Sequence, residues 1–159
     1  MTQRPDADEL LRQAGFDAGE SVLTRRQAEV LALRERGVSQ AAIGDALGTS
    51  RANVSSVEAS ARDNVRKARE TVAFAAALQA PVRIEVDAGT DLYDVPSRVY
   101  EACDDASVKV SHAAPELMKY ISDAAGDAVD GRAVREPILV GVTHDGDVTV
   151  RKPSEPPQD

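Results

Sequence analysis

The chain has 159 residues, of which 42% are hydrophobic, with a formal net charge of −8 and a single cysteine. This length allows one ordinary domain or two small ones. A single cysteine excludes an internal disulfide and a cysteine-cluster zinc site, and no apolar run approaches the ~20 residues of a membrane span. The first ten residues lack the basic start and apolar core of a signal peptide. We therefore expect a soluble, cytoplasmic protein without a membrane partner.

Charge is unevenly distributed along the chain. Residues 21–80 carry 9 basic and 6 acidic side chains, whereas the remainder carries 10 basic and 21 acidic ones. This excess of positive charge in one segment is more informative about a nucleic-acid partner than the net charge is. Asp makes up 16 of the 27 acidic residues and Arg 15 of the 19 basic residues. This halophilic composition suggests a protein that works at high salt, where self-repulsion is screened.

Residues 1–21 form an acidic segment that has two interpretations. The sequence DADELLRQAGF is able to form a short helix that begins near Asp6 or Asp8 and ends at Gly15. The composition favours the other interpretation, a flexible acidic tail.

Three helices are expected between residues 24 and 80. Thr24 and Gln27 make a T-x-x-Q capping box that begins the first helix, and Gly37 closes it. Ser39 caps a second helix, which ends at Gly48. Thr49 or Ser50 then caps the third, which meets no helix breaker before Pro81 and has room for 25 to 30 residues.

The stretch from Gln40 to Ala59 has the spacing of a helix-turn-helix. Gly44 is the small residue where two helices cross, and Gly48 supplies the positive φ of the turn. The inward apolar positions are Ile43, Leu47, Val54 and Val57. This arrangement directs a polar face outward, toward a DNA major groove, and that face consists of Ser50, Arg51, Ala52, Ser55, Ser56 and Ala59. A helical hairpin in an unrelated domain is the alternative.

The third helix carries two further patterns. Apolar residues recur at three- and four-residue steps from Val54 to Ala75, which indicates either a buried face or a dimer seam. A second face gathers Arg62, Arg66 and Arg69. These arginines either contact DNA phosphates or form an ordinary solvated face, and the pattern does not decide between the two.

After Pro81 the pattern predicts a small α/β domain. Strands are expected at residues 82–86 and 108–110, helices at 91–105 and from Pro115 to Gly126, and a hairpin of 138–143 with 148–151 across an Asp-Gly turn. The predicted fold class is α+β, in which an all-α helix-turn-helix domain (residues 22–80) precedes a small α/β C-terminal domain (81–152). The tail at 153–159 is expected to be disordered.

Enzymatic activity is not expected. Cys103, His112 and His144 are the only candidates for a catalytic nucleophile, base or metal ligand, and they lie in different elements. Their spacing lacks the short paired steps of known metal sites. We therefore predict no catalytic residue, no metal and no cofactor, and we interpret Cys103 as a small buried residue on a helix face.

Two segments, Leu23–Val72 and Gly89–Val110, resemble the Tfx family of archaeal DNA-binding proteins. The more specific part is GTSRANVSSVE followed by ARDNVRKARET, because a generic helix-turn-helix would not share the second piece. The resemblance extends from Leu23 to about Val150. It implies a sequence-specific transcriptional regulator with an N-terminal helix-turn-helix and a smaller C-terminal domain, and it implies nothing for the segment before Leu23.

For such a regulator the partner is double-stranded DNA, contacted at both phosphates and base edges. Arg51 is the strongest candidate for reading bases, because arginine can contact guanine through two hydrogen bonds. Asn53 is the least certain, because its place near the turn also suits a helix cap. The base-contact candidates are Ser50, Arg51, Asn53, Ser55 and Ser56. The phosphate-contact candidates are Arg25, Arg26, Arg62, Arg66 and Lys67.

A single helix-turn-helix gives a small interface, so we expect a homodimer on paired half-sites. Either the long third helix or, with slight preference, the C-terminal domain joins the subunits. The alternative function is a ligand-sensing or protein-interaction module, in which a small-molecule effector binds the C-terminal domain and DNA binding is secondary or non-specific. The acidic net charge disfavours a non-specific chromatin-like protein.

Overall fold

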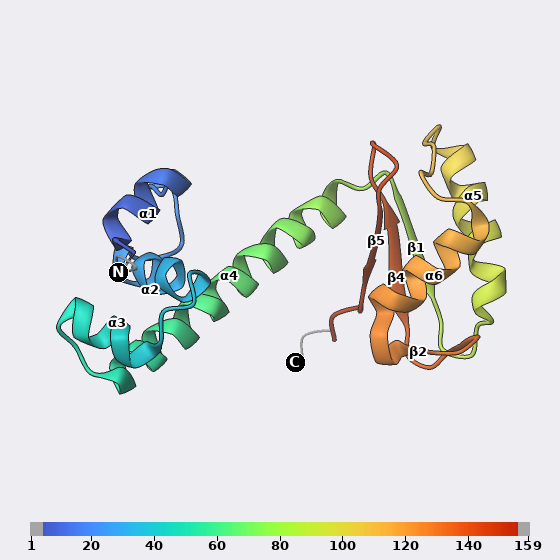
Figure 1. The fold of residues 1–159 in the computed structure, drawn as a ribbon. Helices are drawn as coiled ribbons and strands as arrows, with labels where there is room; N and C mark the ends of the chain where they lie inside the picture. Colours follow the sequence, from blue (N-terminus) through green and yellow to red (C-terminus); the bar gives the residue numbers. More distant parts are fainter. Residues whose placement is uncertain (1–4, 156–159) are drawn as a thin grey trace. The chain divides into compact units, whose positions relative to one another are not determined.

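The computed structural model describes residues 5–155 of the chain (Figure 1). Residues 1–4 of the expected N-terminal segment and 156–159 of the expected C-terminal tail lie outside these residues. The chain folds into two compact units, and the boundary between them lies between Val72 and Ala73. The first unit is helical and the second combines helices with antiparallel strands. Within residues 5–155, no helix is both long and apolar enough to cross a membrane.

The first unit begins with a helix, α1 (Ala7–Ala14), where we had favoured a flexible tail. That expectation is corrected for these residues. The carboxylate of Asp6 caps the helix by accepting a hydrogen bond from the Asp8 N–H, and Gly15 ends it in the left-handed conformation. Leu11 is buried, and α1 packs against the following helix. The sequence analysis had named both of these capping positions but gave more weight to the acidic composition of residues 1–21.

Two short helices follow with the predicted caps. In α2 (Arg25–Glu35), Thr24 and Gln27 form the reciprocal capping box. In α3 (Gln40–Leu47), the Ser39 hydroxyl accepts a hydrogen bond from the backbone of the first turn, and Gly48 ends the helix with φ 69°. These caps satisfy backbone groups that would otherwise be unpaired at helix ends.

The long helix α4 (Arg51–Gln79) has 29 residues, as its freedom from breakers predicted. Its first turns close the small core of the first unit, in which Val54 packs with Val30, Leu33 and Ile43. Full burial along the predicted stripe ends at Ala61, since Val65 and Ala68 are half-buried and Val72 is 70% exposed. Beyond Ala61 the stripe is therefore not a fully buried face in the described chain, and the seam interpretation stays a prediction.

The second unit is built on a three-stranded antiparallel sheet in the order β1-β4-β5. Its strands are β1 (Val82–Val86), β4 (Ile138–Val142) and β5 (Val148–Arg151). Helices α5 (Val95–Asp105) and α6 (Ala114–Ala125) pack against one face (Figure 1). The buried residues of this layer include Val99, Cys103, Leu117 and Ile121, which confirms that Cys103 is a small buried residue on a helix face.

Three details of the second unit differ from expectation. Residues 108–110 form no strand; instead, the adjoining Ser111 N–H donates a 3.3 Å hydrogen bond to the Gly146 carbonyl in the β4–β5 turn. A short hairpin of β2 (Val129–Asp130) and β3 (Ala133–Val134) was not predicted. The expected helix at 91–105 begins with a 3-10 turn (Leu92–Asp94), and another follows α6 (Gly126–Ala128). Short two-residue strands carry too little periodicity to be read from sequence.

The crossing of α3 and the turn depends on the absence of a side chain at Gly44. A Cβ there would lie 2.8 Å from the Thr49 carbonyl oxygen and 3.3 Å from the Arg51 backbone nitrogen. We predict that Gly44→Ala lowers the free energy of unfolding by about 1–3 kcal/mol, because backbone atoms must move to admit the methyl group. Urea denaturation measures this change. Gly19→Ala, whose Cβ meets only a surface carboxylate, is the matched control and should change stability little; equal stability of the two variants would contradict the prediction.

Candidate nucleic-acid interface

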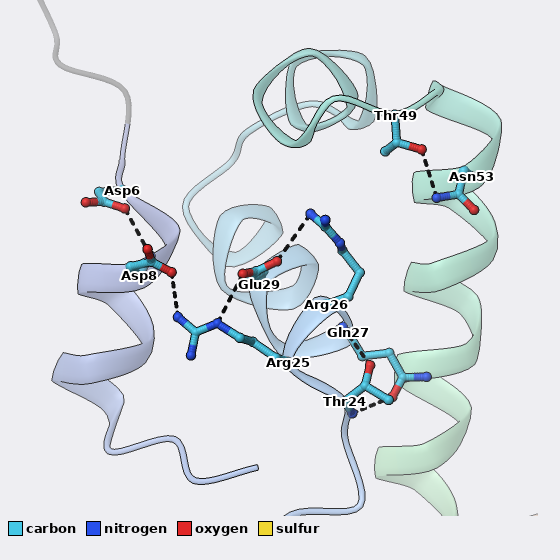
Figure 2. A network of polar contacts seen from close by, with 9 residues as sticks. All are labelled: Asp6, Asp8, Thr24, Arg25, Arg26, Gln27, Glu29, Thr49 and Asn53. Atoms are coloured by element: carbon cyan, nitrogen blue, oxygen red, sulfur yellow. Dashed lines mark hydrogen bonds and ion pairs between the residues drawn. The ribbon is translucent and has the colours of Figure 1, made fainter.

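The turn between α3 and α4 fixes the first residues of α4 through side-chain caps. The Ser50 hydroxyl accepts a 3.0 Å hydrogen bond from the Asn53 N–H. The Asn53 amide in turn donates a 2.9 Å hydrogen bond to the Thr49 hydroxyl (Figure 2). Asn53 therefore has the capping role that we weighed against base contact. Because its amide group still has an unused acceptor, the cap alone leaves both roles open to it.

The first two turns of α4 present a polar, exposed surface. All five base-contact candidates are exposed, and so are Ala52 and Ala59 on the same outward side. Within residues 5–155, Arg51 takes part in no ion pair. An exposed, unpaired guanidinium at the start of a helix keeps all five of its N–H donors available. The exposed candidates on this surface are Ser50, Arg51, Asn53, Ser55 and Ser56.

Arg25 and Arg26 of α2 lie in a network of carboxylates (Figure 2). Arg25 Nη2 lies 2.5 Å from the Asp8 carboxylate of α1, and Glu29 lies within ion-pair distance of both arginines, at 3.4 Å from Arg25 and 3.3 Å from Arg26. The hydrogen bond to Asp8 raises the pKa of Arg25 above its usual value. Nothing in the sequence indicated that residues from the acidic N-terminal segment would pair with a phosphate-contact candidate.

The phosphate-contact candidates on α4 are also paired. Arg66 lies 2.8 Å and Lys67 3.1 Å from the carboxylate of Asp63, one turn earlier. Hydrogen bonds from Arg66 and then Lys67 lower the pKa of Asp63. These side chains are largely exposed, and exposed ion pairs are weak because water screens them. A DNA phosphate is therefore able to compete for both cations.

Glu58 is the residue of this region that the sequence interpretation missed. It is 7% exposed, and its carboxylate accepts hydrogen bonds from Arg34 of α2 at 2.9 Å and Gln40 of α3 at 3.3 Å. Arg62, one turn along α4, adds a 3.2 Å ion pair. Burial by itself raises the pKa of Glu58, but the hydrogen bonds from Arg34, Gln40 and Arg62 outweigh it and leave the pKa below its usual value. One sequence signal was present, since Glu58 lies four residues after Val54 and three before Ala61, on the same side of the helix as these apolar residues.

The three residues considered for catalysis lie in different segments, Cys103 in α5, His112 between α5 and α6, and His144 in the β4–β5 turn. Cys103 is buried, and burial raises the pKa of its thiol. The His112 carbonyl accepts a 2.9 Å hydrogen bond from the Tyr100 hydroxyl, and the His112 ring lies against Tyr120. Among residues 5–155, no group of three or more His, Cys, Asp or Glu side chains is placed to hold a metal ion.

Comparison with known families assigns both parts of the chain. Residues 21–67 match region 4 of sigma-70, and residues 68–150 match the C-terminal region of the DNA-binding protein TFX. The chain belongs to the Tfx family. This is a family of archaeal DNA-binding transcriptional regulators and not of enzymes. The predicted α+β fold class is also confirmed, since a helical helix-turn-helix region precedes an α/β C-terminal region.

Three relatives each align with at least 80% of this chain. A protein of Haloarcula marismortui, named as a candidate transcriptional regulator, is 56% identical over 151 residues, or 95% of each chain. One from Methanocaldococcus jannaschii, with the same kind of name, is 35% identical over 82% of this chain and 96% of its own length. The DNA-binding protein Tfx of Methanothermobacter thermautotrophicus is 38% identical over 80% of this chain and 93% of its own.

The hydrogen bonds that Glu58 accepts lead to a prediction about how the stability of the fold depends on pH. We expect Glu58→Gln to lower the free energy of unfolding at pH 7 by about 1–3 kcal/mol, because a charge-assisted pair is replaced by neutral hydrogen bonds. The pKa of Glu58 is lower in the folded chain than in the unfolded one. Its stabilisation is therefore complete above the unfolded value of about 4.3 and lost as the pH falls through the folded value.

Urea denaturation at a series of pH values measures both effects. The stability difference between wild type and Glu58→Gln should narrow as the pH is lowered from 7 through 4. Glu35→Gln, at an exposed glutamate of α2, serves as the control and should have little effect at any pH. A difference that stays constant with pH would show that the charge of Glu58 does not stabilise the fold.

Proposed function

We propose that this protein is a sequence-specific transcriptional regulator that reads the DNA major groove with the start of α4. The observation that carries the proposal is the exposed polar surface of residues 50–56, held by the Ser50 and Asn53 caps within a family of DNA-binding regulators. A helix N-terminus is the part of a helix-turn-helix that contacts base edges. In an archaeal cell, binding to chromosomal DNA places the protein in the cytoplasm.

The proposed division of roles follows from the ion pairs. Arg51 reads bases, since its guanidinium has no ion-pair partner among residues 5–155, and Ser50, Asn53, Ser55 and Ser56 supply further hydrogen bonds. Phosphates replace the carboxylates that now hold Arg25, Arg26, Arg62, Arg66 and Lys67. Each such exchange releases condensed counterions from DNA, which favours binding. Residues 22–80 form the DNA-binding domain in this proposal, and residues 81–152 form the dimerisation or effector domain.

We also propose that the protein acts as a homodimer on paired half-sites. One helix-turn-helix buries too little surface for tight, specific binding. The exposed part of the α4 stripe, where Val72 is 70% exposed, supports the long helix as one joining surface. The C-terminal domain is the other. In the alternative proposal the C-terminal domain senses a ligand or binds another protein, and DNA binding is secondary or non-specific.

Selection of genomic DNA fragments by the purified protein in concentrated potassium salt tests the main proposal, the salt being chosen to suit the Asp- and Arg-rich composition. We expect enrichment of one short motif, and a palindromic motif would support the homodimer. Uniform recovery of all fragments would support the non-specific alternative. No recovery of DNA would overturn the proposed function.

Two arginine variants test the division of roles. Arg51→Ala should reduce discrimination between the selected motif and its single-base variants by about 1–3 kcal/mol, because a bidentate base contact is lost. Arg66→Ala should weaken binding to all sequences alike and reduce the salt dependence by about one counterion. Fluorescence anisotropy titrations at several salt concentrations measure both quantities. Arg135→Ala, in the second unit, is the control, and an equal loss of specific and random binding in both test variants would refute the division.

A further inference from the structure

The sheet of the second unit has one face covered by α5 and α6. Its opposite face carries Arg83, Gly141 and Thr149. Because strand residues alternate between faces, Val82 and Val86 lie on the face covered by α5 and α6, whereas Arg83 lies on the other. The strand register places Arg83 beside Gly141 of β4, and Gly141 beside Thr149 of β5. These three residues therefore form a row across the second face.

A groove of about 280 Å³ lies over this row. The last turns of α4 contribute Phe74 and Leu78, which are 52% and 57% exposed, and β4 contributes Leu139. Exposed apolar side chains that gather at one place commonly mark a binding site. The groove is slightly smaller than most pockets for drug-sized molecules, so its volume suits a ligand with one or two rings.

The charge of this groove is opposite to that of its surroundings. Residues 73–159 carry 8 basic and 16 acidic side chains. Three of the eight cations, Arg83, Arg151 and Lys152, line the groove, and no acidic residue is among its described lining. Lys152 is partly neutralised by a 2.8 Å ion pair with Glu136. Within residues 5–155 Arg83 has no ion-pair partner, so it is available to an anion.

Gly141 keeps the floor of the groove low. It is buried in the central strand, and a Cβ at this position would lie 2.7 Å from the hydroxyl oxygen of Thr149 on the neighbouring strand. Glycine weakens a strand interior, and it is often found where a ligand or another backbone approaches closely. A larger residue here would both clash with Thr149 and raise the floor.

We propose that this groove binds a small organic anion with a flat apolar body, of the class of aromatic carboxylates. The carboxylate pairs with Arg83, through the two parallel hydrogen bonds that a guanidinium can offer. The ring packs on Phe74 and Leu78, over the floor at Gly141. The site and its ligand class are independent of the proposed reading of DNA, because no residue of the DNA-contact candidates takes part.

Naphthoate and its neutral counterpart, naphthalenemethanol, are suitable probes. The full-length protein is titrated with naphthoate in the absence of DNA, and its amide NMR signals are monitored. We expect saturable chemical-shift changes at Phe74, Gly141 and Thr149. The neutral probe and the Arg83→Gln variant should each lower the affinity about tenfold, the effect of one charge-assisted contact. Arg135→Gln, at an exposed cation outside the groove, should leave the affinity unchanged. Phe74→Ala should weaken the binding of both probes.

Three results would overturn the proposal. Equal binding of the charged and neutral probes would exclude an anion site, and shifts confined to other residues would exclude this groove. Shifts at Gly141 and Thr149 that depend on protein concentration without a probe, together with a dimer in sedimentation, would show that a second copy of the chain occupies the groove. DNA binding is measured separately, so failure here leaves the proposed function standing, and failure of DNA binding leaves this site to be judged by the probes alone.

Discussion

The helix-turn-helix depends on one buried carboxylate. Glu58 of α4 accepts hydrogen bonds from Arg34 of α2 and Gln40 of α3, so a single group joins all three helices. The apolar cluster beneath it is small, and apolar packing has little directional preference. A buried carboxylate, by contrast, is costly unless its partners are correctly placed. This requirement fixes the position of α4 against α2 and α3, and with it the surface offered by residues 50–56.

Much of the fold was predictable because its boundaries are marked by local signals. The capping box at Thr24, the cap at Ser39 and the left-handed Gly48 each act within a few residues. The Asp-Gly turn of the last hairpin is equally local. The prediction of a strand at residues 108–110 was wrong. A strand needs a neighbouring strand with free backbone groups, and three alternating residues do not identify such a neighbour. For α1, the caps at Asp6 and Gly15 were visible in the sequence, but the composition of the whole acidic segment was given more weight than these local signals.

The exposure of the candidate residues was predictable from the sequence, but their ion pairs were predictable only within one helix. Arg66 and Lys67 lie three and four residues from Asp63 on one helix, so their ion pairs follow from helical spacing. The pair of Arg25 with Asp8 joins residues 17 positions apart, and only the packing of α1 on α2 creates it. Glu58 was missed for the same reason, because its partners come from two other helices. The exposure of a side chain can be inferred from the pattern of its own helix. An ion pair between two helices cannot, because it depends on how those helices pack.

The contrast between buried and surface ion pairs has a consequence for how the motif responds to its solvent. In molar salt the Debye length falls to about 3 Å, which removes most of the attraction between exposed charges. The carboxylates of Asp8 and Asp63 then hold their cations only loosely. Dissolved ions have little access to the carboxylate of Glu58, which is 7% exposed. Molar salt thus weakens the ion pairs of Arg25 and Arg66, whereas the Glu58 hydrogen bonds still hold α2, α3 and α4 in alignment.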